Sequence, residues 1–106
     1  ARRNYVHYSS SKGGLEILTK SMALELAEHN IQVNSLVVGA IATDLTPADR
    51  CENLITAIPA GRVGKDIEIA HLVTFLSSNV CDYITGASIT IDGGLTLGFC
   101  ASRPDL

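Results

Sequence analysis

Tyr8 and Lys12 are the two side chains whose types and spacing could do chemistry together. Residues four apart lie on the same face of a helix, so the phenol and the ammonium group could reach one small volume. A free phenol ionises at about pH 10, which is too high for a base at neutral pH. A nearby cation favours the phenolate, and the pair is therefore a candidate proton donor and acceptor. Chance also supplies this spacing, so the features around it must decide its meaning.

Residues 5–29 are expected to form the helix that carries this pair. Apolar residues such as Leu15 and Leu18 recur at spacings of three and four, which is typical of an amphipathic helix. Further apolar residues widen this surface, so we expect one side of the helix to meet a sheet and another a neighbouring helix or subunit. Glu16 and Lys20 are placed to form an i,i+4 ion pair on the exposed face.

Small residues follow the tyrosine and the lysine. Gly13 and Gly14 each weaken a helix by about 1 kcal/mol relative to alanine. Together with Ser9–Ser11 they suggest close approach by another backbone or by a ligand, and simple tight packing is the alternative for the serines. Asn30 suits the left-handed end of a helix.

Residues 31–38 are expected to form a strand. They read Ile-Gln-Val-Asn-Ser-Leu-Val-Val, and a long helix that leads directly into such a strand is the second half of a βαβ unit in a parallel sheet. Open α/β sheets bind ligands at the C-terminal ends of their strands. Gly39 and residues 40–44 are therefore expected to face a ligand, the alternative being a plain exit from strand to loop.

The remaining sequence predicts two more helices and one more strand, which makes the fold class α/β. A short helix is expected over 47–57, a loop over 59–64 and a helix over 66–78. A strand is expected over 88–92, where two glycines end it. The apolar tail, residues 95–106, is expected to dock on its own subunit or on another.

Composition excludes several classes of protein. The chain has 106 residues and a net charge of −3, with no basic patch for nucleic acid and no apolar run of the roughly 18 residues that a membrane span needs. Its three cysteines are widely spaced and its three histidines share no ligand spacing. We therefore expect no metal site, no disulfide framework and a reducing, cytoplasmic compartment, although an organelle is not excluded. The helical pattern starts almost at once without a Met, which suggests a piece of a longer protein.

The order of the features is more specific than any one of them. Tyr8-x-x-x-Lys12 is followed by Ala23-Leu24-Glu25-Leu26-Ala27, Ile31-x-Val33-Asn34-x-Leu36, Gly39-x-Ile41-x-Thr43, Gly61-Arg62-x-Gly64, Ile69-Ala70, Phe75-Leu76-x-Ser78, Tyr83-Ile84-Thr85-Gly86 and Ile91-Asp92-Gly93-Gly94. From about Tyr5 to Leu97 this order closely resembles the C-terminal half of a short-chain dehydrogenase/reductase. The tail is loosely similar to glucose-dehydrogenase-like and 3-oxoacyl-carrier-protein-reductase-like members.

The resemblance implies the C-terminal portion of a Rossmann-like, doubly wound parallel sheet. Residues 1–106 would be a partial domain that lacks its N-terminal dinucleotide-binding half. The Gly-rich turn that seats the pyrophosphate, the residue that chooses NAD or NADP, and the catalytic Ser would all precede Tyr8, beyond the start of this chain. Ser9–Ser11 cannot be that serine because they follow Tyr8 on its own helix. Val38 also stands where the family usually has Pro.

The resemblance also implies an activity, namely NAD(P)-dependent interconversion of an alcohol and a ketone or aldehyde by hydride transfer. Tyr8 would be the catalytic acid/base, and Lys12 would hold the nicotinamide ribose hydroxyls and stabilise the phenolate. Gly39, Ile41 and Thr43 would frame the nicotinamide, with the Ile41 backbone and Thr43 near its carboxamide. Residues 44–62 would be the substrate loop.

Partners follow from the same resemblance. The substrate would be a small alcohol or carbonyl compound, and a sugar, a steroid-like alcohol and an acyl thioester all remain open. The helix at 5–29 and the C-terminal region would build a homodimer or homotetramer. This chain alone is expected to be inactive. The alternative is a truncated chain or pseudoenzyme that acts as a dimerisation module.

Overall fold

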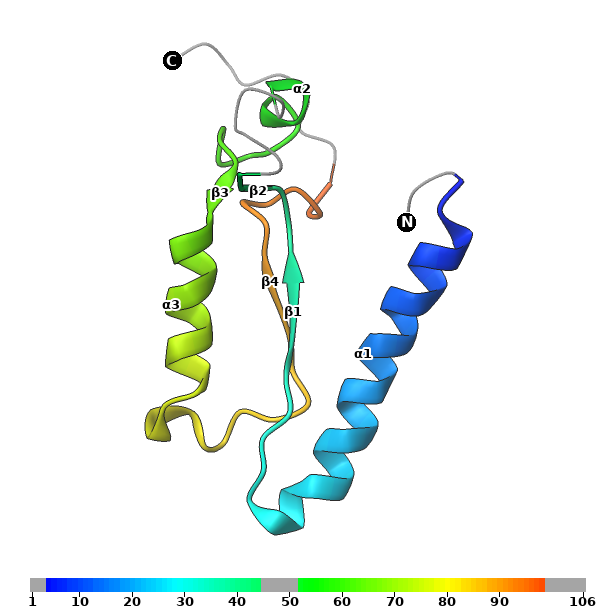
Figure 1. The fold of residues 1–106 in the computed structure, drawn as a ribbon, viewed down its shortest axis with the longest axis vertical. Coiled ribbons are helices and arrows are strands. Elements are labelled where there is room, and N and C mark those ends of the chain that lie inside the picture. The colour runs from blue at the N-terminus through cyan, green and yellow to red at the C-terminus, as the bar shows by residue number, and fades with distance from the viewer. Residues whose placement is uncertain (1–3, 45–51, 99–106) are drawn as a thin grey trace. The chain divides into compact units, whose positions relative to one another are not determined.

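The computed structural model describes residues 4–44 and 52–98. The chain divides into two compact units, the first made of Ala1–Leu36 and Ser78–Ile89 and the second of Val37–Ser77 and Thr90–Leu106. In chain order the elements are α1 (Val6–Leu26), η1 (Ala27–His29), β1 (Ser35–Val38), β2 (Ile41–Ala42), α2 (Glu52–Ile55), β3 (Gly64–Lys65), α3 (Asp66–Leu76), η3 (Asn79–Cys81) and β4 (Ser88–Ile91) (Figure 1). The predicted α/β class is confirmed.

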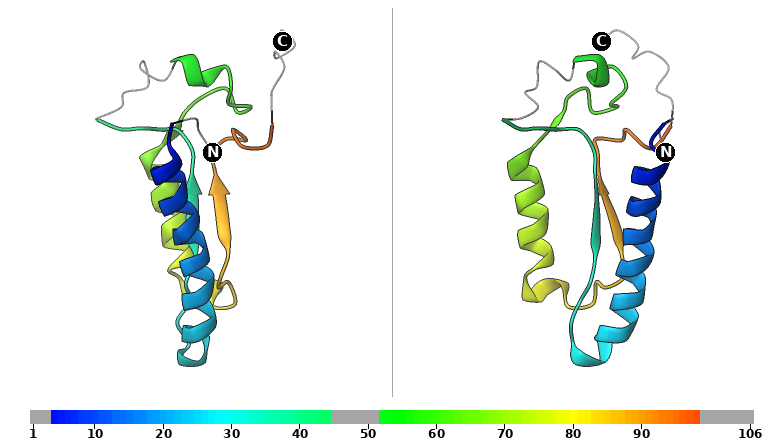
Figure 2. Two further views of the ribbon diagram at one scale, coloured as in Figure 1. Left: turned by 90° about the vertical axis from the view of Figure 1, so that its right-hand side faces the viewer. Right: turned by 45° about the vertical axis from the view of Figure 1, so that its right-hand side comes forward.

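Two small parallel sheets hold the strands. β1 pairs with β4, and β2 pairs with β3. The amide of Ser35 donates to the carbonyl of Ala87 at 2.9 Å and that of Gly39 donates to Ile91 at 3.0 Å. Residue numbers therefore rise together along β1 and β4, and Figure 2 shows their arrows pointing the same way. β2 and β3 are also parallel, with Ile41 opposite Gly64 and Ala42 opposite Lys65.

In the first unit, the buried face of α1 is narrow and consists of small side chains. Thr19 and Ala23 are its buried side chains among those described, and a Cβ on Gly86 would lie 3.5 Å from the Ala23 Cβ. The predicted helix at 5–29 was too long: its α-helical part ends at Leu26, and the last turn tightens into the 3₁₀ helix η1. Asn30 then turns the chain with φ 58° and ψ 36°, which confirms the left-handed end.

The strand predicted at 31–38 was also too long. β1 begins only at Ser35. Before it, the Gly86 amide donates to the Val33 carbonyl at 2.7 Å, and side chains make further bonds between the two segments. The Val33 amide donates to the Thr85 hydroxyl at 3.1 Å. The Asn34 side chain donates to the Ile84 carbonyl at 2.8 Å and accepts from the Ala87 amide at 3.0 Å.

In the second unit, a small core forms around Ile58 and Val63. Packed against them are the partly buried residues Ala40, Ala42, Ile55 and Leu95. The start of the predicted tail therefore docks within the unit, as expected. Leu97, by contrast, is exposed, and residues 99–106 lie outside the described part.

The helices and the last strand of this unit differ from prediction at their ends. In the helix predicted at 47–57, α2 covers 52–55, and residues 45–51 lie outside the described part. The helix predicted at 66–78 ends at Leu76, because Ser77 has φ −89° and ψ 1°. The strand predicted at 88–92 ends at Ile91, because the Asp92 carboxylate accepts bonds from the Gly94 and Thr96 amides, both at 2.8 Å, and so starts a turn. β3, at the end of the predicted loop and just before the predicted helix, was missed.

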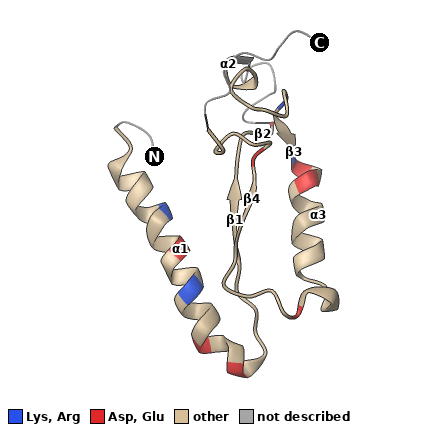
Figure 3. Cartoon of the chain, turned by 180° about the vertical axis from the view of Figure 1, so that it is seen from behind, with Lys and Arg blue, Asp and Glu red and all other residues tan. Residues whose placement is uncertain are grey.

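Much of the apolar surface of α1 stays uncovered in this chain. Leu24 is 83% exposed and Ile17 63% exposed, and the Leu15 and Leu18 side chains are half exposed. Charges of both signs are spread along α1, whereas acidic residues gather at the start of α3 (Figure 3). Within residues 4–44 and 52–98, no helix is long and apolar enough to cross a membrane.

Candidate active site

Tyr8 and Lys12 meet on the first turns of α1. The Lys12 ammonium nitrogen lies 5.4 Å from the centre of the Tyr8 ring, within the range of a cation–π contact. Tyr8 is 53% exposed. Within the described ranges, no Asp or Glu pairs with Lys12. The spacing thus produces the predicted juxtaposition, while the catalytic roles of both residues stay a prediction.

The aromatic neighbour of Tyr8 was not anticipated from the sequence. The Tyr5 ring packs edge-on against the Tyr8 ring with centres 6.1 Å apart, and it stacks on His7 at 6.4 Å. Such edge-to-face contacts hold an otherwise exposed ring in one orientation. The signal that could have revealed this neighbour is the i,i+3 spacing of the two tyrosines, which also places them on one helix face.

One of the three serines after Tyr8 is accounted for by the helix itself. The Ser11 hydroxyl donates to the Tyr8 carbonyl at 2.8 Å, three residues earlier. This bond is a common local use of serine in helices. A Cβ built on Gly13 or Gly14 meets nothing within 4 Å, so within the described chain no backbone approaches them. The close approach expected there stays a prediction.

Gly39, in the second unit, occupies a position next to β4 that has no room for a side chain. A Cβ on this residue would lie 2.6 Å from both the Cα and the Cβ of Asp92. Its amide also donates to Ile91 at 3.0 Å, so the strand end and the start of the turn are in close contact. Packing alone explains the glycine, and its cofactor role stays a prediction.

Ile41 begins the short strand β2, and Thr43 comes directly after that strand. The Gly64 amide donates to the Ala40 carbonyl at 2.9 Å, and a Cβ on Gly64 would lie 2.6 Å from the Ile41 Cδ1. A side chain at position 64 would therefore require the end of the Ile41 side chain to move. Thr43 borders an open hollow of about 390 Å³ together with Ala42, Asp44 and Asp66. These predicted cofactor residues belong to the second unit, whereas Tyr8 and Lys12 belong to the first.

Comparison with known proteins identifies the family. The family described as "Enoyl-(Acyl carrier protein) reductase" matches residues 1–96. The 3-oxoacyl-[acyl-carrier-protein] reductase FabG of Thermotoga maritima is 43% identical over 94 residues, which cover 86% of this chain and 38% of that protein. The L-rhamnose 1-dehydrogenase (NAD(P)(+)) of Azotobacter vinelandii is 37% identical over 94 residues, covering 84% and 37%. The chain belongs to the short-chain dehydrogenase/reductase family.

Solved structures of this family confirm the fold. A short-chain dehydrogenase/reductase from Serratia marcescens superposes with a TM-score of 0.82 at 39% identity, covering 87% of this chain and 38% of that one. A blue fluorescent protein from a metagenomic library, solved in complex with NADPH, superposes at 0.79 with 35% identity, covering 84% and 37%. The fold is thus the Rossmann-like α/β fold, of which this chain spans under two fifths of the relatives' length.

NAD or NADP is the cofactor of this family, and the residues of α1 fit part of it. Because no described carboxylate pairs with Lys12, its three ammonium donors can serve the hydroxyls of a ribose. The neighbouring Tyr8 ring is open to solvent on the same helix face.

An ion pair that the sequence analysis missed braces β3. The Arg62 guanidinium donates to both Glu68 oxygens, at 2.9 and 2.6 Å, and the Lys65 amide donates to Glu68 at 2.8 Å. The Arg62 hydrogen bonds, followed by that of the Lys65 amide, lower the pKa of Glu68 from 4.5 to about 2. Glu68 thus joins the first turn of α3 to the strand opposite Ile41. Arg62 and Glu68 also line a pocket of about 160 Å³ with Ile41, Asp92 and Gly93.

Gly39→Ala and Gly14→Ala should change stability in opposite directions. The first places a methyl group 2.6 Å from Asp92 backbone and is expected to cost on the order of 1–3 kcal/mol. The second fills open space in a helix and is expected to add about 0.5–1 kcal/mol. Denaturant unfolding measures both. A Gly39→Ala protein as stable as the wild type would contradict the close packing described for β1 and Asp92.

The Arg62–Glu68 pair predicts a stability change in acid. Because the folded-state pKa of Glu68 is depressed, its contribution is present above about pH 4.5 and is lost as the pH falls towards about 2. Arg62→Met should raise the Glu68 pKa back towards 4.5, which carboxyl NMR titration measures. Asp92 is the internal control, since Thr96 and Gly94, not Arg62, lower its pKa. An unchanged Glu68 titration in the variant would rule out the assigned cause.

Proposed function

We propose that this chain is the C-terminal part of an NAD(P)-dependent oxidoreductase that interconverts an alcohol and a ketone or aldehyde. The observation that carries the proposal is the exposed Tyr8 beside the Lys12 ammonium on α1, which no acidic residue of the described ranges pairs with. The two groups lie in a chain that belongs to the short-chain dehydrogenase/reductase family. That family supplies a role for each of them.

In the proposed mechanism, Lys12 and the residues after β1 bind the cofactor, and Tyr8 transfers the proton. The nicotinamide supplies or takes up the hydride when the cofactor is bound. Tyr8 exchanges a proton with the substrate oxygen through its hydroxyl, as a general acid in one direction and a base in the other. Lys12 holds the ribose hydroxyls through its ammonium donors. Gly39, the Ile41 backbone and Thr43 frame the nicotinamide ring.

The rest of the active site belongs, on this proposal, to the parent protein. A serine that shares the substrate oxygen with Tyr8 and the Gly-rich turn for the pyrophosphate would precede residue 1. Residues 1–106 would be a portion of one Rossmann-like domain. The substrate is a small alcohol or carbonyl compound, and residues 44–62 form its loop. Cys81, which is free and buried, agrees with a reducing compartment.

A second function is favoured by the uncovered face of α1. With Leu24 83% and Ile17 63% exposed, the helix presents an apolar surface that a partner could cover. In the parent enzyme this surface, together with the C-terminal region, would build a homodimer or homotetramer. In a truncated chain or pseudoenzyme the same surface would be the whole function. The upstream sequence separates the two readings, because only the enzyme needs the Gly-rich turn and the serine.

Tyr8→Phe in the parent protein should abolish turnover and spare cofactor affinity. The phenylalanine keeps the ring that contacts Tyr5 and Lys12 but has no hydroxyl proton to exchange. Steady-state kinetics and a cofactor titration followed by NADH or NADPH fluorescence measure the two effects. Near-normal turnover in the variant would remove Tyr8 from its proposed role.

The 106-residue chain by itself should bind no dinucleotide measurably. It holds the ribose-binding lysine but, on this proposal, not the turn that seats the pyrophosphate. Fluorescence titration with NADH and NADPH tests the expectation, with the parent protein as the positive control. Micromolar binding by the isolated chain would show that its own residues suffice for the cofactor.

A further inference from the structure

Glu16 stands between two lysines on one stripe of α1. Lys12 precedes it by four residues and Lys20 follows it by four, so the carboxylate could pair with either. In the structure it pairs with Lys20, whose ammonium nitrogen lies 3.8 Å from the Glu16 Oε1. Lys12 contacts the Tyr8 ring instead and has no acidic partner among the described residues. Whether Glu16 pairs with Lys20 or with Lys12 therefore determines whether the charge of Lys12 is neutralised.

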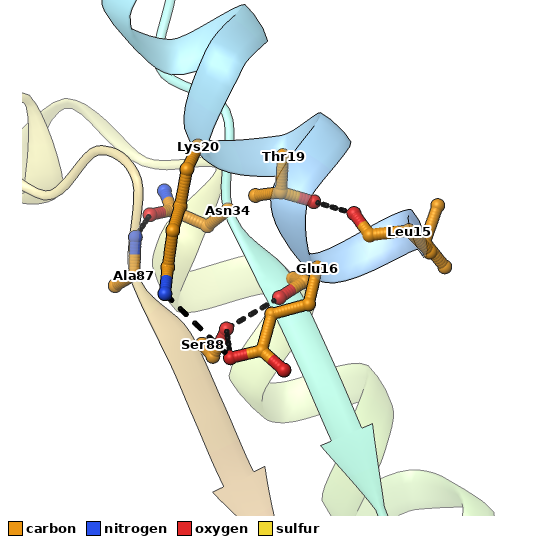
Figure 4. A network of polar contacts seen from close by, with 8 residues as sticks. Leu15, Glu16, Thr19, Lys20, Asn34, Ala87 and Ser88 are labelled. Atoms are coloured by element: carbon orange, nitrogen blue, oxygen red, sulfur yellow. Dashed lines mark hydrogen bonds and ion pairs between the residues drawn. The ribbon is translucent and has the colours of Figure 1, made fainter. Parts of the chain in front are cut away.

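The start of β4 helps to keep Glu16 paired with Lys20. The Ser88 hydroxyl donates to the same Glu16 Oε1 at 3.2 Å, and the Ser35 and Ser88 hydroxyls are 3.0 Å apart (Figure 4). Ser88 is thereby held between β1 and α1. This contact draws the carboxylate towards the strand. Helix geometry adds to the effect, because a glutamate four residues before a lysine pairs better than one four residues after it.

Glu16 also anchors the front of the helix. Ala23, which lies against Gly86, is seven residues further along the chain. Glu16 is one helical turn from Lys12 and two from Tyr8, on the same face. A hydrogen bond at this point restricts rotation of the helix about its axis, and such rotation would turn both side chains away together.

We propose that Glu16 is a positioning residue: Ser88 and Lys20 hold its carboxylate towards β4 and away from Lys12, so that the Lys12 ammonium stays available to the ribose hydroxyls of the cofactor. The cofactor part of this inference rests on the proposed function. The diversion of Glu16 from Lys12 rests on the contacts of the first unit alone. The two parts are tested separately.

The first experiment measures cofactor affinity in the parent protein. Lys20→Met releases Glu16 towards Lys12 and should weaken NADH or NADPH binding roughly two- to fivefold, the range that competition from one exposed i,i+4 ion pair allows. Adding Glu16→Gln to Lys20→Met removes the competing carboxylate and should restore the affinity. Ser88→Ala should weaken binding in the same direction as Lys20→Met.

The matched control is Lys20→Met with Glu25→Gln. It has the same net charge as the rescuing double variant, and Glu25 is exposed on α1 without a described partner. Rescue by Glu16→Gln but not by Glu25→Gln supports the proposal. Equal rescue by both would mean that only the overall charge matters, and would overturn it. An unchanged affinity in Lys20→Met would overturn it as well.

The second experiment reads Lys12 directly and needs no cofactor. An amine that is ion-paired with a carboxylate reacts more slowly with an acylating reagent, because the pairing favours its charged form. Acetic anhydride labelling followed by mass spectrometry should show slower modification of Lys12 in Lys20→Met and recovery with Glu16→Gln. Labelling that is equal in all variants would overturn the proposal. If labelling follows the expected order while the wild-type parent binds no dinucleotide, the diversion of Glu16 stands and the proposed function fails.

Discussion

The side-chain amide of Asn34 fixes the register on which the first unit depends. Parallel strands are not joined by a tight turn, so nothing local sets how β1 and β4 align. Asn34 bonds both the Ile84 carbonyl and the Ala87 amide, about fifty residues away, and main-chain bonds flank it on both sides, from the Gly86 amide to the Val33 carbonyl and from the Ser35 amide to the Ala87 carbonyl. Because the same alignment places Ser88 beside Ser35, it also decides what Glu16 finds opposite it. The Asn34 amide is therefore linked, through Ser88, to the hydrogen bond that Glu16 of α1 accepts.

In the second unit, two carboxylates accept the hydrogen bonds that hold the ends of the strands. Glu68 accepts three hydrogen bonds from Arg62 and Lys65, and Asp92 accepts three from Gly94 and Thr96. Charged acceptors make stronger hydrogen bonds than neutral ones, and in both residues the bonds hold the carboxyl pKa below its usual value. These two groups hold the ends of β3 and β4 beside a core cluster whose buried members among the described residues are Ile58 and Val63. The geometry around Ile41 thus rests on charged hydrogen bonds as well as on apolar burial.

Sequence periodicity predicted the features that depend on neighbouring residues and missed those that depend on residues far away in the chain. The helix types and the order of the main elements follow from residue spacing, and the left-handed Asn30 follows from its own conformational preference. The start of β1 could not be read from Ile31–Asn34, because a β-branched run looks the same whether its partner is a main chain or the side chain of Thr85. β3 is a two-residue strand, Gly64–Lys65, with no alternation to detect. Its existence depends on Ile41 and Ala42 lying opposite, which is information from another part of the chain.

The candidate site likewise has one part that local spacing predicts and one part that depends on a distant residue. That Tyr8 and Lys12 meet could be predicted, because four residues on a helix always bring two side chains to one face. The Glu16–Lys20 pair was predicted as well and is confirmed, because a glutamate pairs better with a lysine four residues after it than with one four residues before it. The Ser88 hydroxyl that bonds the same carboxylate could not be predicted, since it lies 72 residues later in the chain. A helix of this kind can display a reactive pair, but it cannot by itself keep a nearby carboxylate from neutralising the cation. That task requires a fixed polar group on a second element, and in this fold the edge of the sheet provides one.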